Sequence, residues 1–467
     1  MTALLAPPVG TRTRPAPAPT PAPTPRWWRD ASGIACWASA LVVTYLWLTG
    51  GGAHGLVTGP ADALTSLGRL SGLVGADLLL VQVLLMARVP WIERSYGQDE
   101  LARRHRFVGF WSLNLVVLHI GLITLGYAMT DRRGVVNELW HVVTTYSGML
   151  MASLSTACFV LVGVTSVRMA RRKLRYETWH LLHLYAYLGV GLSVPHEIWT
   201  GADFTSSPAA RVYWVSTYLL AAGAVLVFRV GLPLWRSLRH GLVVSGVDHE
   251  GGGVVSVRVR GRDLHRLPVR AGQFFVWRFR DGPGWSAGNP YSLSAAPGHE
   301  LRLTVKDLGD GSSRLAGLRP GTPVLIEGPY GRLTAEQRVT DRVVLIGCGI
   351  GITPLRALLE ELDGVPTTVL YRARSAEDLV LRDEIEQLAE QRGAVVHYLL
   401  GRRRPGSWLP QAAQGHRDAD VLRRLAPDLL RSDVYVCGPP AWTNAVVEAA
   451  RAAGLPQGQL HLERFSW

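Results

Sequence analysis

Four histidines lie at matched spacings on two apolar stretches of this chain. His105 and His119 are 14 residues apart around FVGFWSLNLVVL, and His183 and His196 are 13 apart around LYAYLGVGLSVP. At about 1.5 Å rise per residue, each pair separates its imidazoles by roughly 20 Å along a helix. Two such helices side by side would present histidines at two depths. Facing imidazoles at each depth would suit two b-type haems, one above the other.

His180 is an alternative to His183 at the inner depth. Its separation of 16 residues from His196 corresponds to about 24 Å, against about 21 Å on the other helix, so depth favours His183. The angular positions of the histidines around each helix axis match less well, because a separation of 14 residues returns to nearly the same helix face whereas a separation of 13 residues does not. Pro195 directly precedes His196 and would re-aim it by kinking the helix. A single histidine in a membrane helix is as often only hydrogen-bonded, so the argument depends on all four together.

Apolar segments long enough to cross a bilayer, which takes about 20 residues, occupy the first half of the chain. Six are expected, at approximately 31–49, 66–87, 107–129, 141–167, 178–200 and 212–235. Arginine and lysine gather before the first, between the second and third, between the fourth and fifth, and after the sixth. The positive-inside rule therefore predicts a multi-pass protein of the cell membrane with both termini in the cytoplasm.

The composition agrees with a membrane part joined to a soluble part, since 48% of the 467 residues are hydrophobic and 18% are charged. The net charge of +13 comes from clusters beside apolar segments, which favours a membrane over nucleic acid as its cause. Four widely separated cysteines make an iron–sulfur cluster or structural zinc site unlikely to form. Arg69 in the second segment is expected to pair with a haem propionate, attract an anionic acceptor or snorkel, and Asp77 needs a proton or a partner.

The second half changes to short strands. GVVSVRVRG, GQFFVWRFR, ELRLTVKDL and TPVLIEG predict a small antiparallel barrel. From 341 onward, apolar strands alternate with helical stretches, which predicts a parallel, doubly wound α/β sheet.

A glycine turn, GCGIGITP, follows the first of these α/β strands and opens a helix, which suits a pyrophosphate bound at the helix N-terminus. The strand that ends in YRAR carries Arg372 and Arg374 where an acidic ribose ligand is usual, so NADPH is favoured over NADH. A solvated strand end is the alternative interpretation. The predicted nucleotide contacts are Gly347, Gly349, Gly351, Thr353, Pro354, Arg372, Arg374, Gly438 and Pro439.

Two segments ahead of this turn suit a flavin. In NPYSLS, Tyr291 offers a flat ring and Ser292 a hydroxyl for the flavin N5, and KDLGDGSS offers a turn of small residues for a pyrophosphate. A structural hairpin would explain either segment alone. The predicted FAD contacts are Asn289, Pro290, Tyr291, Ser292, Leu293, Ser294, Lys306, Gly311, Ser312 and Ser313.

Together these segments resemble the membrane branch of the ferredoxin–NADP reductase superfamily, the NADPH oxidases and ferric reductases, over roughly residues 60–467. PYSLS, EGPYG, GCGIGITP, YVCGPP and the terminal ERF match the reductase pattern, and the four histidines match the oxidase haem spacing. The resemblance implies that Phe465 or Trp467 covers the flavin, with ERF favouring Phe465, and places Cys437 at the catalytic centre. Asn289 replaces the usual basic residue, and Ile123 stands where eukaryotic oxidases carry a further histidine.

The sequence therefore predicts a disordered Pro/Ala-rich tail (1–30), a six-span haem-binding transmembrane domain (31–238), an FAD-binding β-barrel (240–338) and an NAD(P)H-binding domain (339–467). Electrons from cytoplasmic NADPH would pass through FAD and two haems to a small acceptor at the outer face, either oxygen or a ferric chelate. Two alternatives remain open: a haem-free, membrane-anchored flavin reductase serving a quinone or protein partner, and a non-enzymatic sensor of NADPH.

Overall fold

A computed structural model describes residues 27–464 apart from 168–170, 172, 175 and 206. The chain divides into two compact units, one formed by residues 26–229 and one whose described part begins at Val230. The division falls close to the expected end of the transmembrane domain. The predicted barrel and α/β domain lie together in the second unit.

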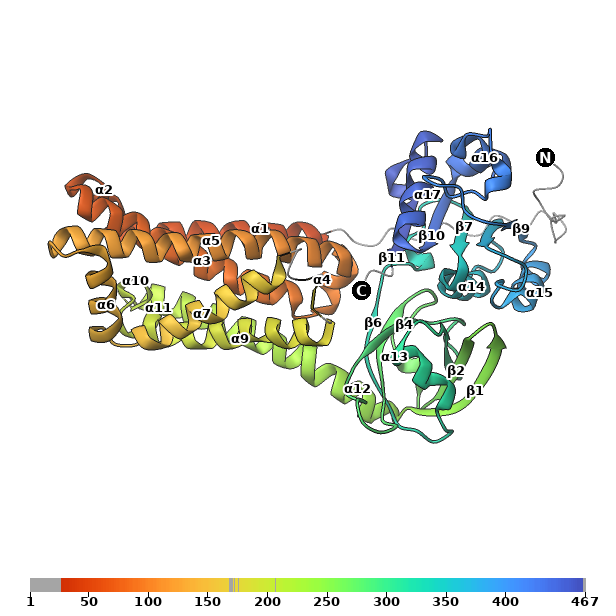
Figure 1. Ribbon diagram of the computed structural model, residues 1–467, viewed down its shortest axis with the longest axis horizontal. Helices are drawn as coiled ribbons and strands as arrows, with labels where there is room; N and C mark the ends of the chain where they lie inside the picture. The colour runs from red at the N-terminus through yellow and green to blue at the C-terminus, as the bar shows by residue number, and fades with distance from the viewer. Residues whose placement is uncertain (1–26, 168–170, 172, 175, 206, 465–467) are drawn as a thin grey trace. The chain divides into compact units, whose positions relative to one another are not determined.

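Helices make up the whole first unit (Figure 1). They are α1 (Trp27–Thr49), α2 (Gly52–Thr58), α3 (Pro60–Met86), α4 (Pro90–Tyr96), α5 (Gln98–Thr130), α6 (Val135–Thr145), α7 (Met149–Ser166), α9 (Tyr176–Trp199), α10 (Ala202–Thr205) and α11 (Pro208–Ala224). A π-helical turn, η2 (Val225–Gly231), continues α11 into α12 (Leu232–His240) of the second unit.

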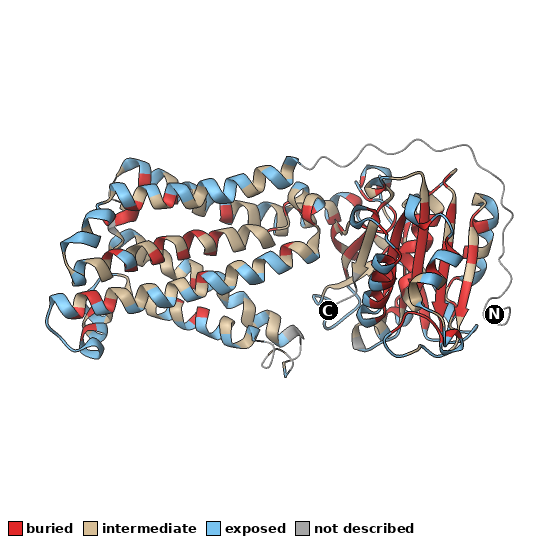
Figure 2. Ribbon diagram, turned by 90° about the horizontal axis from the view of Figure 1, so that it is seen from above, coloured by how far each residue is buried: buried red, intermediate tan, exposed pale blue. Residues whose placement is uncertain are grey.

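Five helices in the described part of the chain are long and apolar enough to cross a membrane: α1, α3, α5, α7 and the continuous segment Pro208–His240. Their surfaces carry exposed large apolar side chains, such as Trp37 at 76% and Leu150 at 70%. Helices of this unit accordingly show much tan and pale blue in Figure 2, whereas the strands of the second unit are mostly red. Exposed apolar surface of this extent suits contact with lipid.

Two of the six predicted segments differ from the expectation. The fourth is interrupted at Gly148, whose φ of 81° ends any continuous helix, so α6 and α7 are separate and α6 runs across the direction of α7 (Figure 1). The fifth forms α9, which has 24 residues but is not among the five apolar helices. Its three histidines and Glu197 lower its hydropathy.

Small residues allow α3 and α5 to pack closely. A Cβ atom added at Gly68 would lie 2.9 Å from the Ile123 side chain, and one at Gly72 would lie 2.5 Å from the His119 ring. Glycine stripes bring helix backbones together in membranes because no side chain separates them. This packing places α3 directly behind the histidines of α5.

The second unit begins with two three-stranded antiparallel sheets, ordered β1-β2-β5 and β4-β3-β6. The strands are β1 (Val243–Gly251), β2 (Val254–Arg260), β3 (Phe274–Phe279), β4 (Asn289–Ser292), β5 (Glu300–Lys306) and β6 (Val324–Tyr330). Alternating apolar residues fill the space between the sheets, with Phe275 and Trp277 fully buried. The four strands predicted here are present, and β1 and β4 are additional.

A parallel sheet ordered β11-β10-β7-β8-β9 follows. Its elements are β7 (Arg342–Cys348), α14 (Ile352–Glu361), β8 (Thr367–Ala373), α15 (Arg382–Arg392), β9 (Val395–Leu400), α16 (Asp418–Leu425), β10 (Ser432–Gly438), α17 (Pro440–Ala452) and β11 (Leu460–Arg464). The chain order reverses between β7 and β10, and ligands of such sheets bind beyond the carboxyl ends of the strands at that point.

Candidate functional site

The structure brings the four predicted histidines together as two pairs. The ring centroids of His105 and His183 are 5.9 Å apart, and those of His119 and His196 are 6.4 Å apart. A metal–imidazole bond of about 2.0 Å, with the ring centroid about 1.2 Å further, separates two axial rings by roughly 6.4 Å. Both pairs therefore have the spacing of imidazoles on opposite sides of one metal ion. His183, rather than His180, is the residue that faces His105.

Hydrogen bonds hold the Nδ1 atom of every one of these rings. His105 lies 3.2 Å from the Gln82 carbonyl oxygen and His119 lies 2.8 Å from that of Gly68. Gln82 and Gly68 are 14 residues apart on α3, as are the two histidines on antiparallel α5. An Nδ1–H donated to a carbonyl leaves Nε2 as the free lone pair, which is how metal-binding histidines are usually oriented.

The α9 histidines use hydroxyl groups in the same way. His196 Nδ1 lies 2.7 Å from Thr200 Oγ1, and that hydroxyl donates to the His196 carbonyl, so it accepts from the ring. His183 Nδ1 lies 3.4 Å from Ser166 Oγ of α7. Gly148 lies against the His196 backbone, where an added Cβ would come within 2.9 Å. The donor set at each depth is thus two imidazoles, which fits a bis-histidine haem.

The two other charged residues of the second apolar segment both have partners. Arg69 donates from Nε to Asp203 of α10 at 2.7 Å and from Nη2 to the Gly50 carbonyl at 3.1 Å. Asp77 accepts hydrogen bonds from Ser39 at 2.5 Å and from Tyr213 at 3.1 Å. These contacts tie α3 to its neighbours, a role that the sequence could not assign.

The flavin segment NPYSLS forms β4 and the residues after it. The Ser292 hydroxyl is buried and has no hydrogen-bond partner among the described residues. Buried hydroxyls rarely lack a partner, so a ligand atom fits there. Tyr291 is partly buried, and burial raises the pKa of its phenol to about 12. Leu293 belongs to the barrel core, and Pro290 pairs with Val276 of β3.

Ser294, also predicted to contact FAD, is engaged elsewhere. Its fully buried hydroxyl accepts hydrogen bonds from Arg302 Nε at 3.1 Å and from Thr304 Oγ1 at 2.7 Å. The Ser294 hydroxyl therefore belongs to a polar network inside the barrel and is not available to bind a cofactor.

The second flavin segment adjoins the first. A Cβ atom added at Gly311 would lie 2.9 Å from Asn289 Oδ1, so the turn lies against the start of β4. The hydroxyls of Ser312 and Ser313 donate to Asp307, which fixes the shape of the turn. The space that a side chain at Gly311 would fill is suited to a pyrophosphate.

The glycine turn lies at the reversal point of the parallel sheet. Gly349 has a φ of 54°, and a Cβ atom at Gly351 would lie 2.5 Å from the Cys437 carbonyl oxygen at the end of β10. Gly347 packs on the side chain of Ile352, while Thr353 is buried and its hydroxyl donates to the Ile350 carbonyl. The backbone of this turn is thus free to face a phosphate.

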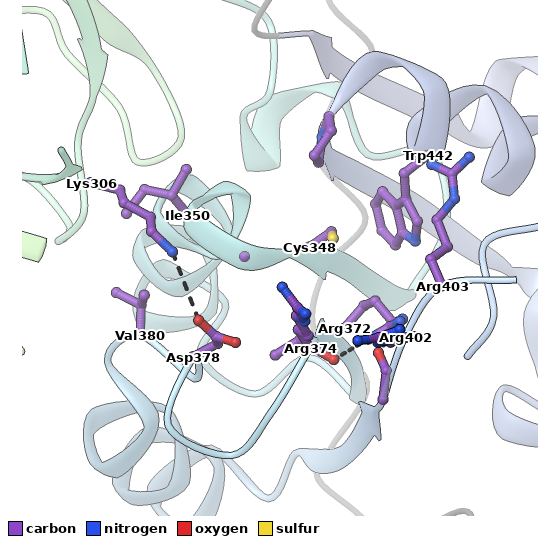
Figure 3. Close-up of a pocket in the computed structure, with 14 residues that line it drawn as sticks. Lys306, Cys348, Ile350, Arg372, Arg374, Asp378, Val380, Arg402, Arg403 and Trp442 are labelled. Atoms are coloured by element: carbon purple, nitrogen blue, oxygen red, sulfur yellow. Dashed lines mark hydrogen bonds and ion pairs between the residues drawn. The ribbon is translucent and has the colours of Figure 1, made fainter. Parts of the chain in front are cut away.

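A cavity of about 510 Å³ opens beside this turn (Figure 3). It is lined by Lys306, Cys348, Gly349, Ile350, Arg372, Ala373, Arg374, Asp378, Val380, Gly401, Arg402, Arg403, Pro439 and Trp442. Its size is that of a small-molecule site. Lys306, predicted to serve the flavin pyrophosphate, reaches this cavity from β5. Cys348 also lines it, and burial raises the pKa of that thiol to about 11.

The arginines of the cavity divide into two kinds. Arg372 is buried, and its guanidinium donates to the Leu399 carbonyl at 3.0 Å and to the Gly401 carbonyl, so it holds the end of β9. Arg374 is exposed, as are Arg402 and Arg403, which the sequence reasoning missed. The run GRRRP after an apolar strand was the signal that would have revealed them.

The predicted catalytic residues are placed less favourably. Cys437 is fully buried in the core of the parallel sheet, and burial holds the pKa of its thiol well above the ordinary value. Its side chain does not line the cavity. Phe465 and Trp467 lie outside the described residues.

Residues 71–194 match the family described as "Ferric reductase like transmembrane component", and residues 345–448 match "Oxidoreductase NAD-binding domain". The chain joins a ferric reductase-like membrane part to an NAD-binding oxidoreductase domain. The first match includes His105, His119 and His183 and ends shortly before His196.

Curated relatives resemble part of this chain. It is 31% identical to the reductase component of propane 2-monooxygenase of Rhodococcus jostii over 39% of this chain and 53% of that protein. It is 29% identical to ferredoxin–NADP reductase B of Sorangium cellulosum over 39% of this chain and 80% of that protein. It is 31% identical to the plasma membrane-associated coenzyme Q6 reductase of Saccharomyces cerevisiae over 36% of this chain and 55% of that protein. The chain thus spans between about half and four fifths of these relatives.

Proposed function

We propose that this protein moves electrons from cytoplasmic NADPH, through FAD and two b-type haems, to an acceptor at the outer face of the cell membrane. The observation that carries the proposal is the arrangement of four histidines in two facing pairs. Each ring has its Nδ1 atom within hydrogen-bond distance of an oxygen, and in His105, His119 and His196 the oxygen accepts, which leaves Nε2 unprotonated. When bound, FAD accepts a hydride from NADPH and divides it into single electrons for the haems.

The histidines themselves would fix the haem positions. His105 and His183 would hold the inner haem, and His119 and His196 would hold the outer one. The carbonyls of Gln82 and Gly68 orient the α5 rings, and neither carbonyl carries a charge that would have to be buried. Separations of 14 and 13 residues along the two helices set the two depths about 20 Å apart.

On the cytoplasmic side, Ser292 would donate to the flavin ring and the turn against Asn289 would receive the flavin pyrophosphate. The glycine turn at Gly349–Gly351 would receive the pyrophosphate of NADPH. Exposed arginines of the cavity, Arg374, Arg402 and Arg403, supply positive charge for the 2′-phosphate, which favours NADPH over NADH. Arg372 supports these residues by ordering the end of β9.

This route needs six spans, with α9 as the fifth in chain order. The five apolar helices support the membrane location, and pairing with α5 at two depths supports α9 as a span parallel to α5. An even number of spans together with the basic clusters supports both termini in the cytoplasm.

The experiment is a visible spectrum of the detergent-purified chain with FAD, recorded anaerobically before and after NADPH. Low-spin haem b bands that sharpen with NADPH are expected. His183→Leu should remove one haem per chain, whereas His180→Leu, one helical turn away, should retain both. An oxidised flavin spectrum without haem bands would overturn the proposal.

The acceptor is oxygen or a ferric chelate in this proposal. A second candidate is a haem-free, membrane-anchored reductase of a quinone, favoured by the likeness to the yeast coenzyme Q6 reductase. Superoxide, ferrous iron and quinol formation, each measured with purified protein in vesicles, separate these acceptors. Haem content separates the two candidates irrespective of the acceptor.

A further inference from the structure

One acidic side chain stands among the basic residues that line the nucleotide cavity. Lys306, Arg372, Arg374, Arg402 and Arg403 are cationic, and Asp378 is the single carboxylate among the described lining residues. Phosphates of a nucleotide carry negative charge, so a carboxylate in their site opposes binding. The Asp378 carboxylate therefore needs a cationic partner, and its position in the cavity needs a functional explanation.

The partner is Lys306. Lys306 Nζ lies 3.8 Å from Asp378 Oδ1 (Figure 3). Ser375 donates to the other carboxylate oxygen at 2.9 Å. Lys306 ends β5 of the barrel, whereas Asp378 follows β8 of the parallel sheet. The ion pair therefore joins two walls of the cavity. Both side chains are 39% exposed, so water and salt weaken the attraction.

A second ion pair joins β5 more firmly to α15, the helix that follows the Asp378 segment. Arg302, on β5, donates to both oxygens of Glu384 at 2.8 and 2.7 Å. Arg356 of α14 lies 2.8 Å from the same carboxylate. A bidentate, partly buried pair of this kind is much stronger than a single exposed contact. The walls would therefore stay together if Lys306 and Asp378 separated.

We propose that Lys306 is a phosphate ligand of the NAD(P)H site and that Asp378 holds it while the site is empty. When a dinucleotide binds, Lys306 exchanges the Asp378 carboxylate for a phosphate oxygen. Asp378 then competes with the nucleotide, lowers its affinity and recaptures Lys306 as the product leaves. The inference rests on nucleotide binding in the proposed function, but it requires neither haem nor a particular acceptor.

The test measures NADP⁺ binding to the full-length, FAD-loaded chain by titration calorimetry. Asp378→Asn frees Lys306 and should tighten binding roughly two- to fivefold, the range expected for an exposed ion pair. Glu377→Gln is the matched control, because it removes the same charge from the neighbouring exposed residue that does not line the cavity. It should change binding by less than about half as much.

A double-mutant cycle tests whether the effect acts through Lys306. Lys306→Met should weaken NADP⁺ binding with unchanged FAD content, and adding Asp378→Asn to it should tighten binding less than Asp378→Asn does when Lys306 is present, because only direct repulsion is then relieved. The proposal is overturned if Asp378→Asn weakens binding, as it would if the carboxylate held a ribose hydroxyl. It is also overturned if the control tightens binding equally or if the full tightening persists without Lys306. A wild-type chain that binds no NADP⁺ would contradict the proposed function itself.

Discussion

Replacing Gly72 by alanine should disturb the outer haem specifically. The new Cβ atom would lie 2.5 Å from His119 Nδ1 and within 3.0 Å of two further ring atoms, whereas ordinary contact begins at 3.4 Å. The ring must therefore retreat by about 0.9 Å, because it is rigid and packed against a helix backbone. That shift breaks the 2.8 Å hydrogen bond to the Gly68 carbonyl. Losing such an orienting bond typically weakens a metal site 10- to 100-fold.

Gly75→Ala is the matched control for this change. It lies one turn along the same face of α3, but its Cβ atom would contact Leu115 at an ordinary 3.4 Å. Both variants gain the same helix propensity of about 1 kcal/mol. Haem per chain, measured as the pyridine haemochrome after dialysis against apomyoglobin, should fall from two toward one for Gly72→Ala alone. Two retained haems with an unchanged reduced spectrum would refute the assignment of His119 as a ligand.

Other expected outcomes concern the cytoplasmic sites. Ser292→Ala should weaken FAD binding roughly threefold to tenfold in a fluorescence titration without lowering the melting temperature of the FAD-free chain, because its hydroxyl has no hydrogen-bond partner among the residues that the structure describes. Ser294→Ala should lower that melting temperature instead, since two side chains donate to it. Replacing Arg402 and Arg403 by alanine should reduce the kcat/KM preference for NADPH over NADH roughly tenfold or more, with NADH turnover unchanged. Iodoacetamide labelling of Cys348, followed by peptide mass spectrometry, should rise about tenfold per pH unit between about pH 7 and pH 10, and NADP⁺ should slow it.

Most of the second unit could be predicted because its strands carry strong local signals. The segments around 254–260, 274–279 and 342–348 alternate or cluster apolar residues between turn residues, and all three are strands. The sequence did not indicate β1, β4 or β11. The β4 segment, 289–292, contains Asn and Pro, and it is a strand because it pairs with β3. Pairing with another strand decides such segments, so local propensity does not predict them.

At the nucleotide site, residue type alone predicts the charge of the lining but not the role of each residue. Arginine at the end of β8 correctly indicated positive charge at the carboxyl edge of the sheet. The two predicted residues nevertheless differ, because Arg372 lies within β8 and donates to backbone carbonyls, whereas Arg374 follows the end of the strand and is exposed. Arg402 and Arg403 reach the same cavity from β9, which only the order of the strands brings alongside.

The histidine pairs depend on the relative register of the packed helices, which cannot be predicted from the sequence of either helix alone. The residues Gln82 and Gly68, whose carbonyls meet the α5 rings, repeat the 14-residue spacing of those rings because the two helices are antiparallel and in close contact. Any backbone carbonyl can accept a hydrogen bond, so this register has no signature except the glycines that permit the approach. On α9, 13 residues would leave the two rings about 140° apart on a straight helix. Both rings nevertheless face α5, so the backbone near Pro195 or the side-chain torsions must take up the difference.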